Sequence, residues 1–287
     1  MGSWGTGLYQ DDAAADVRDM ISTLAKLPVS GDRLLEILLK HRGDGVELDD
    51  DGGPTFWLAL ADQFERRGIS CPKAFERALT AIQTGADLRD LENRGAGAVD
   101  LKKRAKMLDE LAKRLRSPRP VRPRPSAKKP PDFVVNVGEV YAFPTMNGNS
   151  FNAWFRDWER ARFAPNGWGA MLVVARGRVF DWMPWCAISS LSVPSSRKPT
   201  LDDALRARLY SEKQGATLCV PRKSHLRKMG MELLGRVELD PRKAAAVISD
   251  EHTPEFAVTC GWSFIAQARA WKEGLKGGVP VAELLVD

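Results

Sequence analysis

A segment rich in proline and arginine divides the chain and limits what each side of it can fold into. Residues 117–131 read Ser-Pro-Arg-Pro-Val-Arg-Pro-Arg-Pro-Ser-Ala-Lys-Lys-Pro-Pro. Proline fixes φ and lacks an amide hydrogen, so repeated prolines without apolar periodicity favour an extended polyproline conformation over a packed core. We therefore expect a helical domain at 1–116, a linker at 117–131 and an α+β domain at 132–287.

The charge of the chain also changes around this segment. Residues 1–100 hold 11 Lys and Arg against 18 Asp and Glu, whereas residues 101–131 hold 12 against 2. The remaining residues are nearly balanced, with 20 against 17. An acidic front, a basic joint and a nearly neutral back are typical of separate modules.

Before the linker, apolar residues recur at helical spacing in five stretches. Asp11 or Asp12 is expected to cap the first helix, because a side-chain carboxylate accepts hydrogen bonds from the unpaired amides there. Pro54 suits the first turn of a later helix and Gly68 its end. The stripes that define the five helices include Val17 to Leu24, Leu34 to Leu39, Trp57 to Phe64, Phe75 to Ile82 and Leu101 to Leu115.

After the linker the pattern changes to short apolar runs that favour strands. We expect a mostly antiparallel, strongly curved sheet with a few helices. One hairpin is predicted around Arg176-Gly177-Arg178, a further strand at Phe256 to Thr259, and helices at 201–210 and 263–273. The predicted fold class is therefore an N-terminal α domain followed by an α+β domain.

The first residues, Met1-Gly2-Ser3-Trp4-Gly5-Thr6-Gly7, carry a resemblance to a known family. This start resembles that of the bacterial domain-of-unknown-function family four-two-five-nine, which has a Met-Gly-x-Trp-Gly-x-Gly pattern and no established activity. The likeness covers the N-terminal half of the chain. Glycines allow tight bends of the backbone, so we expect Trp4 to be inserted into the core of the first domain.

A second resemblance starts after the linker, at Gly138-Glu139-Val140-Tyr141-Ala142-Phe143-Pro144. This stretch resembles the first strand of immunity-protein family twenty-six, and Leu234-Gly235-Arg236-Val237 resembles a later strand of that family. Members of this family bind and neutralise a bacterial toxin and catalyse nothing. The resemblance implies a protein partner, with a toxin as its class, and an immunity or antitoxin role.

Catalytic signatures are mostly absent from the sequence, and the two Ser-x-x-Lys matches, which start at Ser70 and Ser195, lack the motifs that accompany this pattern in enzymes. No phosphate-binding glycine loop, nucleophile elbow or paired-histidine zinc motif occurs. The four cysteines, Cys71, Cys186, Cys219 and Cys260, lack close pairing, so buried thiols are favoured over a zinc site that adds His225 or His252. We predict no enzyme activity, no cofactor and no metal. Without a long apolar run or a secretory signal, we expect a cytoplasmic protein and no membrane contact.

Two sets of residues are candidates for binding. Trp185 follows Pro184 at the end of a predicted strand, and Trp and Arg dominate protein interfaces. We predict that Trp185 is displayed as an anchor for a protein partner, flanked by Arg222 and Arg227. The alternative function is contact with nucleic acid through the basic joint, whose candidate residues are Arg119, Arg122 and Arg124.

Overall fold

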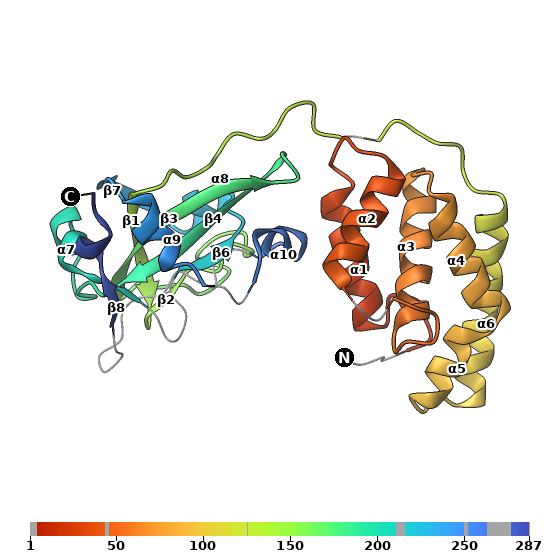
Figure 1. Ribbon diagram of the computed structural model, residues 1–287. Helices are drawn as coiled ribbons and strands as arrows, with labels where there is room; N and C mark the ends of the chain where they lie inside the picture. Colours follow the sequence, from red (N-terminus) through yellow and green to blue (C-terminus); the bar gives the residue numbers. More distant parts are fainter. Residues whose placement is uncertain are drawn as a thin grey trace. The chain divides into compact units, whose positions relative to one another are not determined.

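The computed structural model describes residues 5–43, 46–124, 126–210, 216–249, 252–262 and 277–286, without the side chains of 41 and 42. The chain divides into two compact units, Met1–Lys128 and Lys129–Asp287, which are described separately below. Figure 1 follows the chain from the helical unit to the α+β unit. The predicted fold class is confirmed, and the boundary between the units falls within the segment predicted as a linker. Trp4 and the helix predicted at 263–273 lie outside the described residues.

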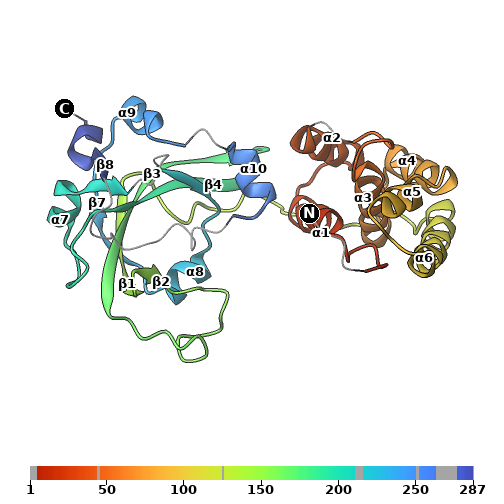
Figure 2. The same cartoon turned by 90° about the horizontal axis from the view of Figure 1, so that it is seen from below.

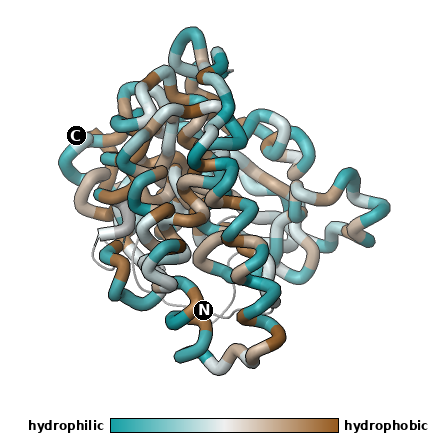
Figure 3. Tube along the Cα trace, turned by 90° about the vertical axis from the view of Figure 1, so that its right-hand side faces the viewer, coloured by the Kyte–Doolittle hydropathy of each residue, from teal (hydrophilic) through white to brown (hydrophobic). Residues whose placement is uncertain are grey.

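The described part of the helical unit contains six helices. They are α1 (Asp12–Leu24), α2 (Gly31–Arg42), α3 (Gly53–Arg67), α4 (Pro72–Gln83), α5 (Ala86–Asn93) and α6 (Ala98–Arg116). α3 packs against α1, α4, α5 and α6, and every residue from Gly53 to Glu65 is buried. Apolar and polar stretches alternate along these helices in Figure 3. The expected five helices are present, and α5 is an addition whose eight residues are too few to show a clear apolar stripe.

The start of α1 confirms one prediction made from the sequence. Asp11 caps the helix, because its carboxylate accepts hydrogen bonds from the amides of Ala13 and Ala14 at 2.9 and 3.3 Å. Gly68 ends α3 in the left-handed region at φ +65°, also as expected. The start of α1 and the end of α3 are thus set by residue types, a capping Asp and a Gly, that can be recognised in the sequence.

Buried charges tie the helical unit together. Arg104 and Asp87 form a bidentate pair at 2.7 and 2.8 Å, with only 3% and 0% of their side chains exposed. Asp62 on α3 accepts hydrogen bonds from Tyr9 at 2.6 Å and from Arg114 at 2.5 Å. Burial raises the pKa of Asp62, but hydrogen bonds from Tyr9, Arg114 and Arg66 outweigh it and hold the pKa below its usual range.

The residues after α6 run back along the helical unit. Arg119 pairs with Glu65 of α3 at 3.1 Å, and the amide of Arg122 donates to the carbonyl of Gly68. The amide of Ala127 donates to the carbonyl of Lys26 at 2.9 Å. Specific side-chain and backbone bonds thus attach most of the proline–arginine segment to the unit that precedes it.

The described strands of the second unit form one sheet of eight strands. They are β1 (Glu139–Met146), β2 (Asn149–Ser150), β3 (Gly167–Val179), β4 (Met183–Leu191), β5 (Arg208–Tyr210), β6 (Thr217–Cys219), β7 (Glu232–Arg236) and β8 (Gly277–Pro280). The order is β2-β1-β3-β4-β5-β8, with β7 beside β1 and β6 beside β4. All these pairs are antiparallel, and the described sheet does not close into a barrel.

This sheet carries a core on each face, because successive side chains of a strand point to opposite sides. The first core includes Leu172 and Ala187 and is covered by α7 (Leu201–Arg206), α9 (Pro241–Ala246), α10 (Pro254–Thr259) and the 3-10 helix Val281–Leu284. The second core includes Met171 and Ile188 and is covered by α8 (Lys223–Lys228) and the loop at 151–166. Figure 2 shows α9 and α10 on one side of β3 and β4 and α8 on the other.

Three local predictions for this unit are wrong in whole or in part. The helix predicted at 201–210 ends at Arg206, and Arg208–Tyr210 form β5 instead. The β3–β4 hairpin turns at 180–182, between the paired Val179 and Met183, and Phe180 and Asp181 have φ values of +52° and +59° that suit a tight turn. Arg176 and Arg178 stay within β3, where their guanidinium groups lie 4.1 and 4.0 Å from the ring centre of Phe133. The strand predicted at Phe256 to Thr259 belongs to α10 instead, because Thr253 caps that helix and Pro254 fits its first turn.

Candidate functional site

Trp185 lies in β4 as part of the packed sheet. Its indole covers Gly177 of β3 so closely that a Cβ on Gly177 would be 2.8 Å from the indole nitrogen. The half-buried ring packs against the first core. The absence of a side chain at Gly177 is therefore what gives this large ring its place.

Arg222 and Arg227 belong to the opposite face of the sheet. Arg222 is the residue before α8 and Arg227 lies within that helix, and both side chains are exposed. α8 buries Met229 in the second core and packs Leu226 against it. The expected grouping of these arginines with Trp185 is corrected: the sheet separates them, because Trp185 faces the first core.

The linker arginines are placed differently from one another. Arg119 is ion-paired with Glu65, whereas the Arg122 side chain is exposed. The guanidinium of Arg124 donates to the carbonyl of Leu27 at 2.5 Å and to that of Val29. Burial lowers the pKa of Arg124. Arg119 and Arg124, two of the three arginines expected to contact phosphates, thus bond to groups of the helical unit.

The most exposed aromatic side chains of the α+β unit in the described ranges are Trp154 and Phe155, at 59% and 47%. The Lys228 ammonium holds their loop by donating to the carbonyls of Ala153 at 3.1 Å and Phe155 at 2.9 Å. The Arg222 guanidinium lies 4.8 Å from the Trp154 ring centre. We call Trp154, Phe155, Arg222 and Lys228 the Trp154 surface.

A further contact fixes the indole of this surface. The buried His225 ring meets Trp154 edge to face, with ring centres 4.9 Å apart. Burial and the charges of Arg222 and Lys228 lower the pKa of His225, so the imidazole is mostly neutral at pH 7. The Trp154 ring is thus exposed and at the same time in contact with two side chains, Arg222 and His225.

The segments that form this surface are strongly basic. Residues 151–165 and 220–231 contain seven Lys and Arg against two acidic residues, Asp157 and Glu159. An exposed, oriented indole among cations can stack on an apolar partner group while the cations attract carboxylates. The residues of the Trp154 surface are therefore suited to binding a partner that offers apolar and acidic groups.

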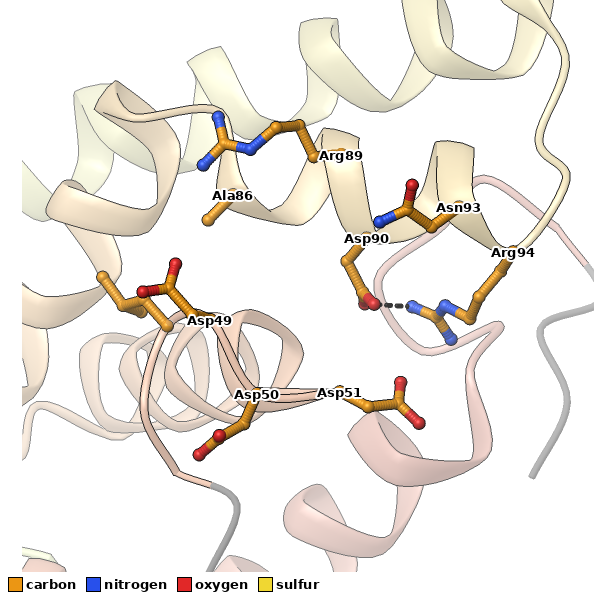
Figure 4. A pocket seen from close by; sticks show the side chains of 9 residues that line it. Asp49, Asp50, Asp51, Ala86, Arg89, Asp90, Asn93 and Arg94 are labelled. Carbon is orange, nitrogen blue, oxygen red and sulfur yellow. Dashed lines mark hydrogen bonds and ion pairs between the residues drawn. The ribbon is translucent and has the colours of Figure 1, made fainter.

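The helical unit contains a second candidate, a cavity of about 420 Å³ between α5 and the loop before α3. Figure 4 shows Asp49, Asp50 and Asp51 opposite Arg89, Asp90 and Arg94. Arg94 bonds to Asp90 and to Asp11, each at 2.7 Å. Burial raises the pKa of Asp90, and the charges of Asp51 and Asp87 add to this against the opposing effect of Arg94. We call this cavity the acidic pocket.

A third candidate is a cavity of about 410 Å³ in the α+β unit, walled by rings and glycines. We call it the tryptophan pocket. Its lining comprises Pro144, Trp158, Pro165, Asn166, Gly167, Trp168, Ser196, Gly230 and Glu232. These residues come from β1, the loop at 151–166, the start of β3, the loop after β4, and the segment from α8 into β7. Pro144 and Trp168 are direct partners across β1 and β3, so their rings share one face of the sheet.

The cysteines and acidic residues form no metal centre within the described ranges, where no cluster of three or more His, Cys, Asp or Glu could hold an ion. Cys186 and Cys219 are buried cross-strand partners whose sulfurs lie 3.5 Å apart. Burial and the neighbouring thiol raise the pKa of Cys219 well above its usual value. Such thiols are weak nucleophiles, since the thiolate is the reactive form.

No protein-family model, no curated protein and no solved structure matches the chain. The two family resemblances therefore stay predictions, as does the immunity role. Among the described helices, none combines the length and the apolar character that crossing a membrane requires.

Sequence reasoning identified α8 as a basic cluster but did not single out Trp154 and Phe155 as an anchor. One signal was present. Two large aromatic residues stand next to each other between Asn152 and Arg156, and adjacent residues seldom share one buried face. The sequence did not reveal that Lys228, far along the chain, would hold this loop in place.

Proposed function

We propose that this chain is a non-enzymatic binding protein whose Trp154 surface docks on an acidic surface of a partner protein. The observation that carries the proposal is Trp154 itself, 59% exposed yet held by Arg222 and His225. Exposed aromatic side chains on long flexible loops lose conformational freedom when they bind. A ring that is already oriented loses less, so more of its contact energy becomes affinity.

Charge supports an acidic protein partner. The cations around Trp154 would speed its approach and disfavour basic competitors. Asp157 and Glu159 lie among these cations, with the Asp157 carboxylate 3.8 Å from the Arg156 guanidinium. Carboxylates repel a run of phosphates but can pair with the scattered basic residues of a protein surface. This arrangement favours a protein over nucleic acid.

The resemblance to immunity proteins adds a class of partner, a bacterial toxin that the chain neutralises by direct binding. A cytoplasmic location is part of the same proposal, because the buried Cys71, Cys186 and Cys219 suit a reducing compartment. Both parts of the proposal depend on the partner, which the next experiment identifies.

The experiment compares the full chain with Trp154→Ala, Arg222→Gln and a matched control, Leu233→Ala. Leu233 is 56% exposed and lies on β7, so its truncation removes a similar exposed apolar group elsewhere in the unit. Affinity capture from the native cell with quantitative mass spectrometry identifies proteins that the parent and the control retain but Trp154→Ala does not. The purified candidate is then titrated by calorimetry.

We expect an acidic partner whose affinity falls at least about tenfold with Trp154→Ala, as for a hot-spot residue, and remains unchanged with Leu233→Ala. Circular dichroism should show that every variant is folded. Unchanged affinity in a folded Trp154→Ala variant would contradict the proposal. Captured material that depends on Trp154 but is removed by nuclease would replace it with a nucleic-acid function.

A further inference from the structure

The tryptophan pocket has rigid walls. The Trp158 indole donates to the carbonyl of Lys228 at 2.7 Å and meets Phe163 edge to face, with ring centres 5.2 Å apart. Gly230, at φ +66°, lies so close to Pro144 and Trp158 that an added Cβ would be 3.2–3.3 Å from both rings. A pocket whose rings are fixed by such contacts needs little rearrangement to receive a ligand.

A cation of the chain itself already lies at this pocket. The Lys198 ammonium is 5.7 Å from the ring centre of Trp168 and forms an ion pair with Glu232. Trp168 and Glu232 both line the cavity. The pair of an aromatic face and a carboxylate therefore selects positive charge, and Lys198 shows where that charge lies.

Lys198 is held weakly enough to be replaced. The side chains of Lys198 and Glu232 are 43% and 52% exposed, and ion pairs between exposed groups contribute little to stability. A guanidinium offers more to the same two partners than an ammonium does. It stacks flat on an indole and donates two parallel hydrogen bonds to one carboxylate.

We propose that the tryptophan pocket binds an arginine side chain presented by an extended, proline-flanked segment of a partner protein, and that Lys198 competes with it for Glu232. The arginine takes the place of the Lys198 ammonium against Trp168 and Glu232. The flanking prolines lie against the rings of Pro144, Trp158 and Pro165, because polyproline segments dock on grooves lined by aromatic rings with little loss of entropy. The pocket shares no lining residue with the Trp154 surface and selects the opposite charge.

The probe is a fluorescently labelled synthetic peptide, Pro-Arg-Pro-Val-Arg-Pro-Arg-Pro, which copies residues 118–125. It is titrated onto the full chain by fluorescence anisotropy. Within the chain, Arg119 and Arg124 of the same stretch bond to groups of the helical unit. Peptides with every Arg replaced by Lys or by Gln test the choice of cation.

We expect binding that weakens at least about fivefold in Glu232→Gln and in Trp168→Ala and tightens about two- to fivefold in Lys198→Gln, the range for an exposed ion pair. The Lys peptide should bind more weakly than the Arg peptide, and the Gln peptide more weakly still. Trp154→Ala should leave the affinity unchanged, so failure here is distinguishable from failure of the proposed function.

Glu232 is exposed, so its replacement by Gln tests the site without disturbing a core. The matched control is Asp51→Asn in the acidic pocket, which would weaken binding only if a general attraction to carboxylates held the peptide. Three results would overturn the proposal: no binding by the parent chain, equal affinity in the parent and Glu232→Gln, or a larger loss in Asp51→Asn than in Glu232→Gln.

Discussion

Arg104 and Arg114 of the helical unit and Arg222 of the α+β unit have opposite surroundings. In the helical unit, Arg104 is buried against Asp87, and Arg114 joins Asp62 and Glu65. In the α+β unit, Arg222 lies exposed against Trp154. Residues 101–131 carry the highest positive charge of the sequence, yet several of their arginines bond to groups of the helical unit. A nearly neutral stretch displays a basic surface, because most of its acidic residues lie outside the two segments that form that surface.

This contrast shows why net charge along a sequence does not locate a binding surface. A cation contributes to attraction of a partner only when no carboxylate of the same protein has already neutralised it. Arg119 illustrates this, since it pairs with Glu65, whereas Arg124 keeps its charge but directs it toward two backbone carbonyls of the helical unit. The following predictions test the contrast, from the largest expected effect to the smallest.

The largest effect is expected for Arg104→Ala. Removing this side chain leaves the Asp87 carboxylate buried without its partner, which typically costs about 3–5 kcal/mol of stability. Urea unfolding of the full chain measures the change. Arg116→Ala, at an exposed position of the same helix, is the matched control and should change stability by less than about 0.5 kcal/mol. Equal effects of the two variants would show that Arg104 is not held inside the unit.

A second test compares the two tryptophans. Trp185→Ala should lower stability by about 2 kcal/mol, part of the usual cost for a fully buried Trp, because the indole is half-buried over Gly177. Trp154→Ala should change stability by less than about 0.5 kcal/mol. Thermal melting of both variants beside the parent checks this. If Trp185→Ala leaves the melting temperature unchanged but weakens partner binding, a displayed Trp185 is favoured after all.

The third test uses pH on the helical unit. The pKa of Asp62 is lower in the folded protein than in the unfolded chain, where it is about 3.9. The ionised carboxylate therefore stabilises the fold above about pH 4, and this stabilisation is lost as pH falls through the folded-state pKa. Urea unfolding between about pH 2 and 6 should show a smaller loss on acidification in Asp62→Asn than in the parent. Parallel losses would mean that other carboxylates dominate.

The smallest effect concerns nucleic acid. Any binding of single-stranded nucleic acid should depend on α8. Replacing Arg222 and Arg227 by Gln should therefore make the plot of log affinity against log salt concentration less steep. The slope should fall by about 0.7 for each phosphate that the variant no longer neutralises. Replacing Arg119 and Arg124 should leave the slope unchanged, because helical-unit groups already meet these side chains. If the slope instead changed only when Arg119 and Arg124 were replaced, the basic joint would be the part of the chain that binds nucleic acid.

Much of the fold was predictable because local chemistry decides it. Asp11 or Asp12 was expected to cap a helix, Gly68 could end one, and the apolar stripes of α1 to α4 and α6 appear in the sequence as regular spacings. The prolines of 117–131 marked the change from one unit to the next for the same reason, since closely repeated prolines remove the amide donors that a helix or a sheet needs.

The errors occurred where a neighbour distant in sequence decides the outcome. Arg176 and Arg178 lie in β3 because that strand pairs with β4 as far as Val179, and both guanidinium groups contact the ring of Phe133. Trp185 was expected at the surface, but Gly177 on the adjacent strand leaves space for its ring. Neither contact has a signature within a few residues of the position it affects.

The sequence by itself thus determined where helices begin, where the chain changes character and which residue types were available for binding. Only the tertiary structure decided which of those residues face a partner. The physical reason is that exposure and neutralisation depend on groups brought together from distant positions. Glu65 meets Arg119, Gly177 receives Trp185, and Lys228 holds the loop that presents Trp154, each across a separation that no local pattern records.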